Sequence, residues 1–234
     1  MSVVLVTGAS RGIGRAIAAR FVREGQQVIA CARGQAGLDA LKADLPAVEC
    51  FACDMRDDAA VDALAQAVLE RHGGVELLVN NAGAFQPGAL AEEADGVLQE
   101  MLQVNLFGAY RLTRRLLPAM LAKQSGMVLN VCSTASIAAY SNGGSYSIAK
   151  HALLGFTRNL REEMKPHGVR VVALIPGATH TDSWAGVALP PERFMPAEDV
   201  AEMAWTAWSL SPRTVVEEIV MRPQLGDIGA ADFA

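Results

Sequence analysis

Short apolar runs alternate with longer amphipathic stretches along nearly the whole chain. An apolar run of about four to eight residues bounded by turn residues is typical of a buried strand, whereas apolar residues spaced three and four apart are typical of a helix. The pattern predicts seven strands, at Val3–Val6, Gln27–Ala32, Val48–Cys53, Val75–Val79, Met127–Val131, Val169–Ile175 and Val215–Val220. It predicts helices between them, at Ala16–Arg23, Ala59–Arg71, Val97–Lys123, Ser147–Lys165 and Pro196–Ser209.

The order of these elements indicates an α/β fold. Strands that alternate with helices form βαβ units, which build a doubly wound, mostly parallel seven-stranded sheet of the Rossmann type with helices on both faces. A chain of 234 residues can bury one core of this size, so we expect a single domain over residues 1–225 and a flexible tail over 226–234. Ligands of such sheets bind beyond the carboxyl ends of the strands. Binding residues are therefore expected directly after the strands.

A glycine-rich segment follows the first predicted strand and leads into the first helix, with the sequence Thr7-Gly8-Ala9-Ser10-Arg11-Gly12-Ile13-Gly14. Glycines at this spacing let the backbone turn tightly and come close to a pyrophosphate, and the free amide groups of the following helix favour its negative charge. The alternative is a glycine turn that binds no ligand. A nucleoside-triphosphate loop is disfavoured, because no Gly-Lys-Ser/Thr follows.

Tyr146 and Lys150 stand near the start of a predicted helix, and Ser133 lies just past the strand before it. Residues four positions apart share one helix face, so the tyrosine and the lysine can act on one ligand. A phenol has an unperturbed pKa of about 10, and a nearby ammonium lowers that pKa and favours the phenolate. Taken alone, the pair has a second interpretation, an exposed tyrosine beside a surface lysine.

Taken together, these motifs resemble the short-chain dehydrogenase/reductase family over nearly the whole chain. The resemblance also rests on Asn80-Asn81-Ala82-Gly83, on Asn105, and on Pro176-Gly177 with Thr181. It implies that Tyr146 exchanges a proton with the carbonyl or alcohol oxygen and that Ser133 hydrogen-bonds the same oxygen. It implies that Lys150 lowers the pKa of the phenol and bonds the nicotinamide ribose. Asn105 would connect Lys150 to solvent through backbone and water.

The resemblance further implies a set of cofactor contacts and no metal site. The contacts are Gly8, Ser10, Arg11, Gly12, Ile13, Gly14, Arg33, Asp54, Met55, Asn81, Ala82, Gly83, Tyr146, Lys150, Pro176, Gly177, Thr179 and Thr181. Asp54 is expected on the adenine, and Asn81 near the adenosine ribose. Thr179 and Thr181 are expected near the carboxamide and the diphosphate, although Thr179 replaces the apolar residue common in the family.

The end of the second predicted strand indicates which nicotinamide cofactor is used. Enzymes that select NAD place an acidic residue there to bond the ribose 2′-hydroxyl. That position is Ala32 here, and Arg33 follows it, which can grip a 2′-phosphate through charge-assisted hydrogen bonds. Arg11 is expected to reach the same phosphate from the other side. The expected cofactor is therefore NADP(H), and the alternative is that both arginines are surface charges.

Charge and composition narrow the partners. A net charge of −5 and a pI of about 5.4 disfavour nucleic acid, and the basic cluster Arg111, Arg114 and Arg115 is expected to be a solvated helix face. The N-terminal residues lack the features of a secretory signal, and no apolar run approaches the ~20 residues of a membrane span. A cytoplasmic location without membrane contact is expected. The four cysteines are then reduced, and Cys50 and Cys53 are expected in the core rather than on a metal.

The sequence thus predicts an NADP(H)-dependent oxidoreductase that interconverts a carbonyl and an alcohol by hydride transfer. Two alternatives are a catalytically silent NADP-binding regulatory or scaffold protein, and a sugar-nucleotide epimerase or dehydratase, which the glycine spacing disfavours. The predicted substrate lid, residues 182–195, favours an uncharged, partly apolar carbonyl compound because it holds few charges and Trp184, Val187, Leu189, Phe194 and Met195. The segment Val220-Met221-Arg222-Pro223-Gln224 replaces the Asp-Gly-Gly of acyl-carrier reductases in the family, which weakens that substrate class.

Several residues keep two interpretations. Asn80 is expected to serve the structure rather than a ligand, and His180 is the histidine placed nearest to the nicotinamide turn. Trp184, Phe194 and Met195 belong either to the lid or to the core. Trp205 and Trp208 belong either to the core or to a subunit contact. The apolar positions of the two long predicted helices exceed what one sheet face can cover, so a homodimer or homotetramer is expected.

Overall fold

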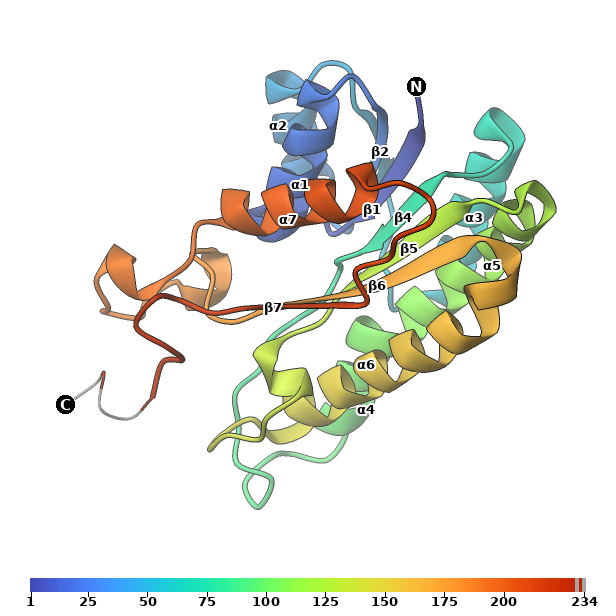
Figure 1. Ribbon diagram of the computed structural model, residues 1–234. Helices are drawn as coiled ribbons and strands as arrows, with labels where there is room; N and C mark the ends of the chain where they lie inside the picture. The colour runs from blue at the N-terminus through green and yellow to red at the C-terminus, as the bar shows by residue number, and fades with distance from the viewer. Residues whose placement is uncertain (230–231, 233–234) are drawn as a thin grey trace.

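One parallel sheet runs through the centre of the molecule. The structure is a computed structural model that describes residues 1–229 and Asp232. The strands are β1 (Val3–Thr7), β2 (Gln27–Ala32), β3 (Glu49–Ala52), β4 (Leu77–Asn80), β5 (Gly126–Val131), β6 (Val169–Pro176) and β7 (Glu218–Met221). They pair in the order β3-β2-β1-β4-β5-β6-β7, and every neighbouring pair is parallel. The predicted doubly wound, seven-stranded sheet is confirmed (Figure 1).

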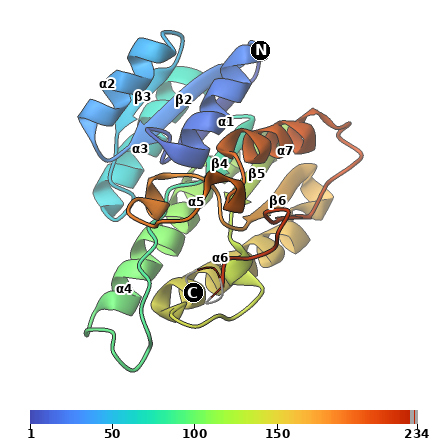
Figure 2. The ribbon, with the colours of Figure 1, turned by 90° about the vertical axis from the view of Figure 1, so that its left-hand side faces the viewer.

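Helices cover both faces of this sheet (Figure 2). One face carries α1 (Gly12–Arg23), α2 (Gln35–Asp44) and α7 (Ala197–Ser209), and the other carries α3 (Asp58–His72), α5 (Gly108–Lys123) and α6 (Gly144–Met164). Within β1, Val4 and Val6 pack toward α1 and α7. Leu5, between them, packs toward α3 and α5. The strands are therefore apolar on both sides, as in sheets that are covered on both faces.

Two elements differ from the prediction. The apolar pattern does not predict α2, which buries only Leu38 and Leu41 and so has a short apolar stripe. The predicted helix Val97–Lys123 is divided into α4 (Val97–Leu102), a π-helical turn (Gln103–Phe107) and α5. A π-helical turn is a local insertion in a helix. Its five residues are too few to alter an apolar periodicity that is assessed over a longer window.

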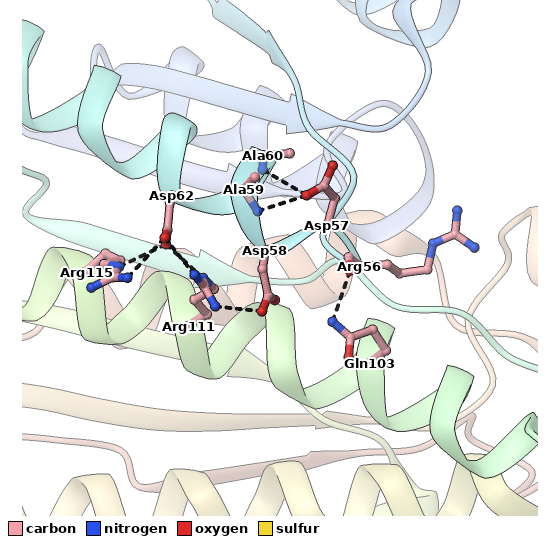
Figure 3. Close-up of polar contacts among 9 residues, drawn as sticks. All are labelled: Arg56, Asp57, Asp58, Ala59, Ala60, Asp62, Gln103, Arg111 and Arg115. Atoms are coloured by element: carbon pink, nitrogen blue, oxygen red, sulfur yellow. Dashed lines mark hydrogen bonds and ion pairs between the residues drawn. The ribbon is translucent and has the colours of Figure 1, made fainter.

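Acidic residues of α3 bind arginines of α5 (Figure 3). Asp62 accepts hydrogen bonds of 2.7–3.0 Å from both Arg111 and Arg115, which hold the pKa of its carboxyl well below the usual range. Asp58 accepts a further bond of 2.7 Å from Arg111, and Arg114 lies over an aromatic ring. The basic face is solvated as expected, since Arg114 and Arg115 are exposed, and Arg111 and Arg115 also join α5 to α3.

The two cysteines of the Cys-x-x-Cys segment differ in burial. Cys53 is buried, whereas Cys50 is half-buried and its thiol lies 3.8 Å from the carbonyl oxygen of Leu38. Across residues 1–229 and Asp232, no three His, Cys, Asp or Glu side chains converge as metal ligands. Over the same residues, no helix combines the length and the apolar character that crossing a bilayer requires.

Candidate active site

The strand order reverses between β1 and β4, and the segments that follow these two strands are bonded to each other. Asn81 Nδ2 donates to the carbonyl oxygens of Thr7 at 2.9 Å and Gly8 at 3.2 Å. The hydroxyl of Thr7 accepts from the backbone N–H groups of Asn81 and Ala82, each at 3.0 Å. The glycine-rich segment and the Asn-Asn-Ala-Gly segment are therefore one rigid unit at the carboxyl edge of the sheet.

The glycines of this unit allow close contact within the protein. Gly8 and Gly12 have φ angles of +64° and +54°, which favour glycine. A Cβ at Gly8 would lie 2.8 Å from the Cα of Ala82, and one at Gly14 would lie 2.3 Å from Asn81 Nδ2. A Cβ at Gly12 would lie 3.0 Å from the methyl carbon of Thr181. These glycines bring α1, β4 and the segment after β6 together around one point.

The N-terminus of α1 is open to an anion. Its N-cap residue, Arg11, forms no side-chain capping bond within the described residues, and its first turn contains no acidic side chain. In contrast, Asp57 caps α3 by accepting from the N–H groups of Ala59 and Ala60 (Figure 3). The first N–H groups of a helix attract negative charge when no side chain satisfies them. The start of α1 can therefore bind a diphosphate.

The end of β2 is apolar and is followed by an exposed arginine. Ala32 is 5% exposed, and Arg33 is exposed next to it. Asp54, beyond the neighbouring β3, receives bonds from the guanidinium of Arg56, which together with the charge of Arg33 lower the pKa of its carboxyl. Arg11 points elsewhere, because it donates to Asp182 at 3.2 Å. That Arg11 and Arg33 face one phosphate stays a prediction.

The segment after β3 lies against the start of α5. A Cβ at Gly108 would lie 2.4 Å from the carbonyl oxygen of Met55, so the two backbones approach closely. Gln103, in the π-helical turn, donates to the carbonyl oxygen of Arg56 at 3.0 Å (Figure 3). Asp54 and Met55 are thereby held near the edge of the sheet where β1 ends. Ser10 lies opposite α2, since a Cβ at Gly37 would lie 2.9 Å from its Cβ.

Ser133 and Tyr146 face each other beyond β5. Ser133 begins a short 3-10 helix, and its hydroxyl oxygen accepts from the N–H group of Ala135 at 3.1 Å. Tyr146 lies in the first turn of α6. Burial raises the pKa of Tyr146 to about 12, and the nearby Ser133 side chain opposes this rise. The phenol is therefore protonated at neutral pH.

Lys150 lies one turn further along α6 and is buried. Its ammonium donates to the carbonyl oxygen of Val131 at 3.0 Å and lies 5.9 Å from the centre of the Tyr146 ring. Burial lowers the pKa of Lys150. At Tyr146 burial has the largest effect and raises the pKa of the phenol. The lowering of this pKa by Lys150, together with a cationic nicotinamide, stays a prediction.

Asn105 lies in the π-helical turn and holds the segment after β4. Its Nδ2 donates to the carbonyl oxygens of Ala84 at 3.0 Å and Met101 at 3.1 Å, and its Oδ1 accepts from the N–H group of Ala84. A Cβ at Gly83 would lie 2.6 Å from Asn105 Oδ1 and 3.6 Å from Lys150 Nζ. Asn105 therefore approaches Lys150 across Gly83, where only a residue without a side chain fits.

Asn80 serves the structure, because its amide donates to two buried side chains.

In the segment after β6, the side chain of Thr179, a predicted cofactor contact, points into the protein. Pro176 ends β6, and the N–H group of Gly177 donates to the carbonyl oxygen of Met221 at 2.8 Å. Thr179 is 4% exposed, and its hydroxyl donates to the carbonyl oxygen of Gly177 at 3.0 Å. Thr181 is half-buried beside the start of α1, where it meets Gly12. A contact of the Thr179 side chain with a ligand, expected from the resemblance, is disfavoured by this internal bond.

An aromatic row leads from Tyr146 into the lid. The ring of Phe85 meets Tyr146 edge-on at 4.9 Å between centroids and stacks on Trp184 at 6.4 Å. Phe194, which is buried, lies 5.2 Å from Trp184 and 5.8 Å from His180. Sequence reasoning missed Phe85, although its position two residues past the Asn-Asn-Ala-Gly segment was a usable signal. Met195, Trp205 and Trp208, for which the sequence left two interpretations, pack in the core: Met195 belongs to the cluster between the sheet and helices α1 and α7, and the two tryptophans pack against it.

The lid is bonded to the C-terminal segment. The buried guanidinium of Arg193 donates to Asp232 at 2.6 Å and 3.0 Å. It also donates to the carbonyl oxygens of Gly226 at 3.4 Å and Asp227 at 3.3 Å. Part of the segment that we expected to be a flexible tail therefore has specific partners. Residues 230–231 and 233–234 of that expected tail lie outside the described residues.

Known proteins share this fold and these motifs. The family described as short chain dehydrogenase matches residues 2–190. A protein of Streptomyces coelicolor that is named as a ketoacyl reductase is 36% identical to this chain. The matched region spans 96% of this chain and 83% of that protein. The alcohol dehydrogenase of Thermococcus sibiricus, solved with 5-hydroxy-NADP, superposes with a TM-score of 0.90 at 30% identity, over 98% of this chain and 99% of that one. A variant of the actinorhodin polyketide ketoreductase, solved with NADPH, superposes with a TM-score of 0.88 at 32% identity, over 97% of this chain and 98% of that one.

This chain belongs to the short-chain dehydrogenase family. It is an oxidoreductase that interconverts a carbonyl and an alcohol by hydride transfer with a nicotinamide cofactor. The relatives described above are reductases or dehydrogenases by name, which gives no support to the alternative of a scaffold without turnover.

Proposed function

We propose that this protein is an NADP(H)-dependent carbonyl reductase in which Tyr146 exchanges a proton with the substrate oxygen. The observation that carries the proposal is the placement of the Tyr146 phenol beside Ser133, with buried Lys150 bonded to the end of β5 from the next turn of the same helix. A proton donor must lie within hydrogen-bond reach of the reacting oxygen and must hold its proton at the working pH. Tyr146 meets the second requirement, because its pKa is raised to about 12.

The segments after β1, β3, β4 and β6 fit a nicotinamide dinucleotide. The uncapped start of α1 offers N–H groups to a diphosphate, and the close-packed glycines leave no side chain in the way. When bound, the cofactor supplies or accepts the hydride. The residues that would hold it, apart from Tyr146 and Lys150, are Gly8, Ser10, Arg11, Gly12, Ile13, Gly14, Arg33, Asp54, Met55, Asn81, Ala82, Gly83, Pro176, Gly177, Thr179 and Thr181, with Thr179 contributing backbone rather than its hydroxyl.

The side chains of the site divide the proton chemistry between them. Tyr146 Oη donates its proton to the carbonyl oxygen during reduction and takes a proton from the alcohol during oxidation. Ser133 Oγ already accepts from the N–H group of Ala135, so its hydrogen is free to bond the same substrate oxygen and stabilise its developing charge. Lys150 orients the ribose. Asn105 fixes the peptide of Ala84, and its water-mediated link to Lys150 stays a prediction.

The residues at the end of β2 and the solved relatives support NADP(H) over NAD(H). Ala32 stands where an acidic residue would repel a 2′-phosphate, and Arg33 is exposed beside it. Asp54, the nearest carboxylate beyond β3, is occupied by Arg56, so it does not neutralise Arg33 through a direct bond. Solved relatives were obtained with NADPH and with a derivative of NADP, which supports the same choice.

The aromatic row supports an uncharged, partly apolar carbonyl substrate. Phe85 lies directly against the proton donor, and Trp184 extends the apolar surface toward the lid. Pockets of this kind obtain affinity from apolar contact and orientation from a few polar groups. A β-ketoacyl thioester is the second candidate, because two of the relatives are named as ketoacyl reductases or ketoreductases.

A panel of carbonyl compounds tests this proposal. Oxidation of NADPH is followed with apolar ketones, aldehydes and quinones, with an acetoacetyl thioester, and with a polyanionic ketone as the matched opposite. We expect turnover of an uncharged apolar ketone or aldehyde to exceed that of the polyanionic compound. Preference for the thioester would establish the second candidate. Preference for the polyanionic compound would contradict the proposed substrate class.

We also propose a cytoplasmic homodimer or homotetramer. Large apolar side chains are exposed on the helices that precede and contain Tyr146, with Phe107 at 44%, Tyr110 at 43% and Ile148 at 42% exposure. Contact with a second chain would bury these side chains. The unpaired cysteines suit a reducing compartment. Light scattering at micromolar concentration should give at least twice the chain mass of 24.7 kDa, and a monomer would contradict the assembly.

A further inference from the structure

The helix that carries Tyr146 and Lys150 is capped from outside by Glu93. The residue before α6, Gly143, forms no side-chain capping bond in the described part of the chain, and the first turn of α6 contains no acidic residue. Glu93 lies in the segment that connects β4 to α4. Its Oε1 accepts from the N–H group of Ser145 at 2.9 Å, and its Oε2 accepts from the Ser145 hydroxyl. Ser145 is 2% exposed and Glu93 is half-buried, so both bonds are partly sheltered from water.

Two glycines form the seat of the Glu93 carboxylate. A Cβ at Gly144 would lie 2.0 Å from Glu93 Oε1 and 2.5 Å from the carbonyl oxygen of Gly88. A Cβ at Gly88 would lie 3.0 Å from Glu93 Cγ and 3.2 Å from Oε1. The N–H group of Gly88 also donates to the carbonyl oxygen of Asn142 at 3.0 Å. A side chain at Gly144 would therefore collide both with the carboxylate and with the backbone of Gly88, which indicates a specific contact site for Glu93 at the start of α6.

This seat is next to the reacting tyrosine in two ways. Ser145, which bonds Glu93, is followed directly by Tyr146. The segment that holds Glu93 also holds Phe85, whose ring meets Tyr146 at 4.9 Å. A carboxylate at a helix N-terminus is favoured by the helix dipole and by the free N–H groups, so it fixes the first turn. Glu93 thereby joins the turn that orients the phenol to the segment that forms the aromatic side of the substrate site.

We propose that Glu93 is a positioning residue for the reduction, acting on Tyr146 through Ser145. The proposal rests on the proposed role of Tyr146 as proton donor. Loss of the carboxylate frees the first turn of α6 and the Phe85 segment, while the cofactor-binding segments after β1 and β2 keep their own bonds. A displacement of about 1 Å at a reacting group can lower a rate by about a hundredfold. The expected signature is a loss in kcat without a loss in cofactor affinity.

Glu93→Ala, Glu93→Gln and Tyr146→Phe, compared with the wild type, test this proposal. Glutamine keeps an acceptor for the N–H group of Ser145, so it should recover most of the activity that alanine loses. Glu92→Ala is the matched control, because Glu92 is exposed one residue earlier. The measurements are kcat and KM for the best carbonyl substrate, the Kd of NADPH from fluorescence, and the midpoint of thermal unfolding.

We expect Glu93→Ala to lower kcat about tenfold to a hundredfold with the Kd of NADPH changed by less than about twofold, and Glu92→Ala to match the wild type. Normal kcat in Glu93→Ala, or an equal loss in Glu93→Gln and Glu93→Ala accompanied by weaker NADPH binding, would overturn the positioning role. If Glu93→Ala does not fold, Glu93→Asp decides, because its shorter side chain withdraws the carboxylate from Ser145. A lower kcat with an unchanged Kd of NADPH in this variant supports the positioning role, and a normal kcat overturns it. Near-normal turnover in Tyr146→Phe would instead refute the proposed function itself.

Discussion

Lys150 Nζ donates a hydrogen bond of 3.0 Å to the carbonyl oxygen of Val131, the last residue of β5. The lysine is 5% exposed, and burial lowers the pKa of its ammonium. This bond attaches the second turn of α6 to the end of the central sheet, at a point 5.9 Å from the ring of Tyr146. The bond to the end of β5 therefore fixes the position of the Lys150 ammonium relative to the phenol of Tyr146.

Replacing this lysine should remove catalysis and weaken cofactor binding together. Lys150→Ala leaves the carbonyl of Val131 without its donor and removes the cation beside Tyr146. We expect kcat/KM to fall by at least about a hundredfold, the lower range for loss of a group in acid–base chemistry. Steady-state kinetics and fluorescence titration with NADPH measure both effects. Lys165→Ala, at an exposed lysine beyond the same helix, is the control, and an equal result in both variants would remove Lys150 from the site.

The pH dependence should differ between the two directions of the reaction. The pKa of Tyr146 is raised to about 12, so the phenol holds its proton across the neutral range. Reduction requires the protonated form, and its kcat/KM should be flat between about pH 6 and 9. Oxidation requires the phenolate, so its kcat/KM should rise as the pH rises over the same range. A fall in the reductive kcat/KM with a midpoint below about pH 8 would contradict the role of burial at Tyr146.

Cofactor selectivity should depend on the end of β2. One charge-assisted contact contributes ~1.5–3 kcal/mol, so Arg33→Ala should lower the preference for NADPH over NADH by about tenfold to a hundredfold. Ala32→Asp should reject NADPH, because its carboxylate repels the 2′-phosphate. The ratio of kcat/KM for the two cofactors is the measurement. Arg213→Ala, at an exposed arginine, should leave the ratio unchanged. A wild type that prefers NADH would refute the choice of cofactor and leave the reductase chemistry intact.

The bond between the lid and the C-terminal segment should affect the substrate more than the cofactor. Asp232→Ala removes the carboxylate that accepts two bonds from Arg193, so the lid loses a fixed partner. We expect the KM for the carbonyl substrate to rise about twofold to fivefold, the range of a modest ion pair, with kcat for a saturating substrate preserved. Asp199→Ala, in the first turn of α7, is the control. An unchanged KM would show that the segment serves only to cover Arg193.

The apolar pattern predicts the sheet well because it reports burial. It places β2 at its observed bounds, Gln27–Ala32, because the apolar run Val28–Ala32 fills all of that strand after its first residue. It misplaces β7, which begins at Glu218 rather than Val215. Val215 and Val216 pack against the core without belonging to a strand. The residues of β2 and the residues before β7 are equally apolar, and apolar character alone does not show which residues form the hydrogen bonds of a strand.

The site was predictable where motifs follow strands, and less so where the chain folds back on itself. Ser133, Tyr146 and Lys150 come together because only a short 3-10 helix and a loop separate β5 from α6. Glu93 bonds Ser145 across 52 positions, and Arg193 bonds Asp232 across 39. Neither pair has a local sequence signal, because the type of an acidic residue does not show whether its side chain is buried or which distant residue it bonds. The inward turn of Thr179 was hidden for the same reason.

The most direct test of the central claim compares turnover in the wild type and in Tyr146→Phe. Phenylalanine keeps the ring that meets Phe85 and removes only the hydroxyl beside Ser133, so fold and NADPH binding should persist. With NADPH and the best substrate of the carbonyl panel, kcat should fall by about a hundredfold to ten-thousandfold while the Kd of NADPH stays within about twofold. Near-normal kcat in the variant would contradict Tyr146 as the proton donor.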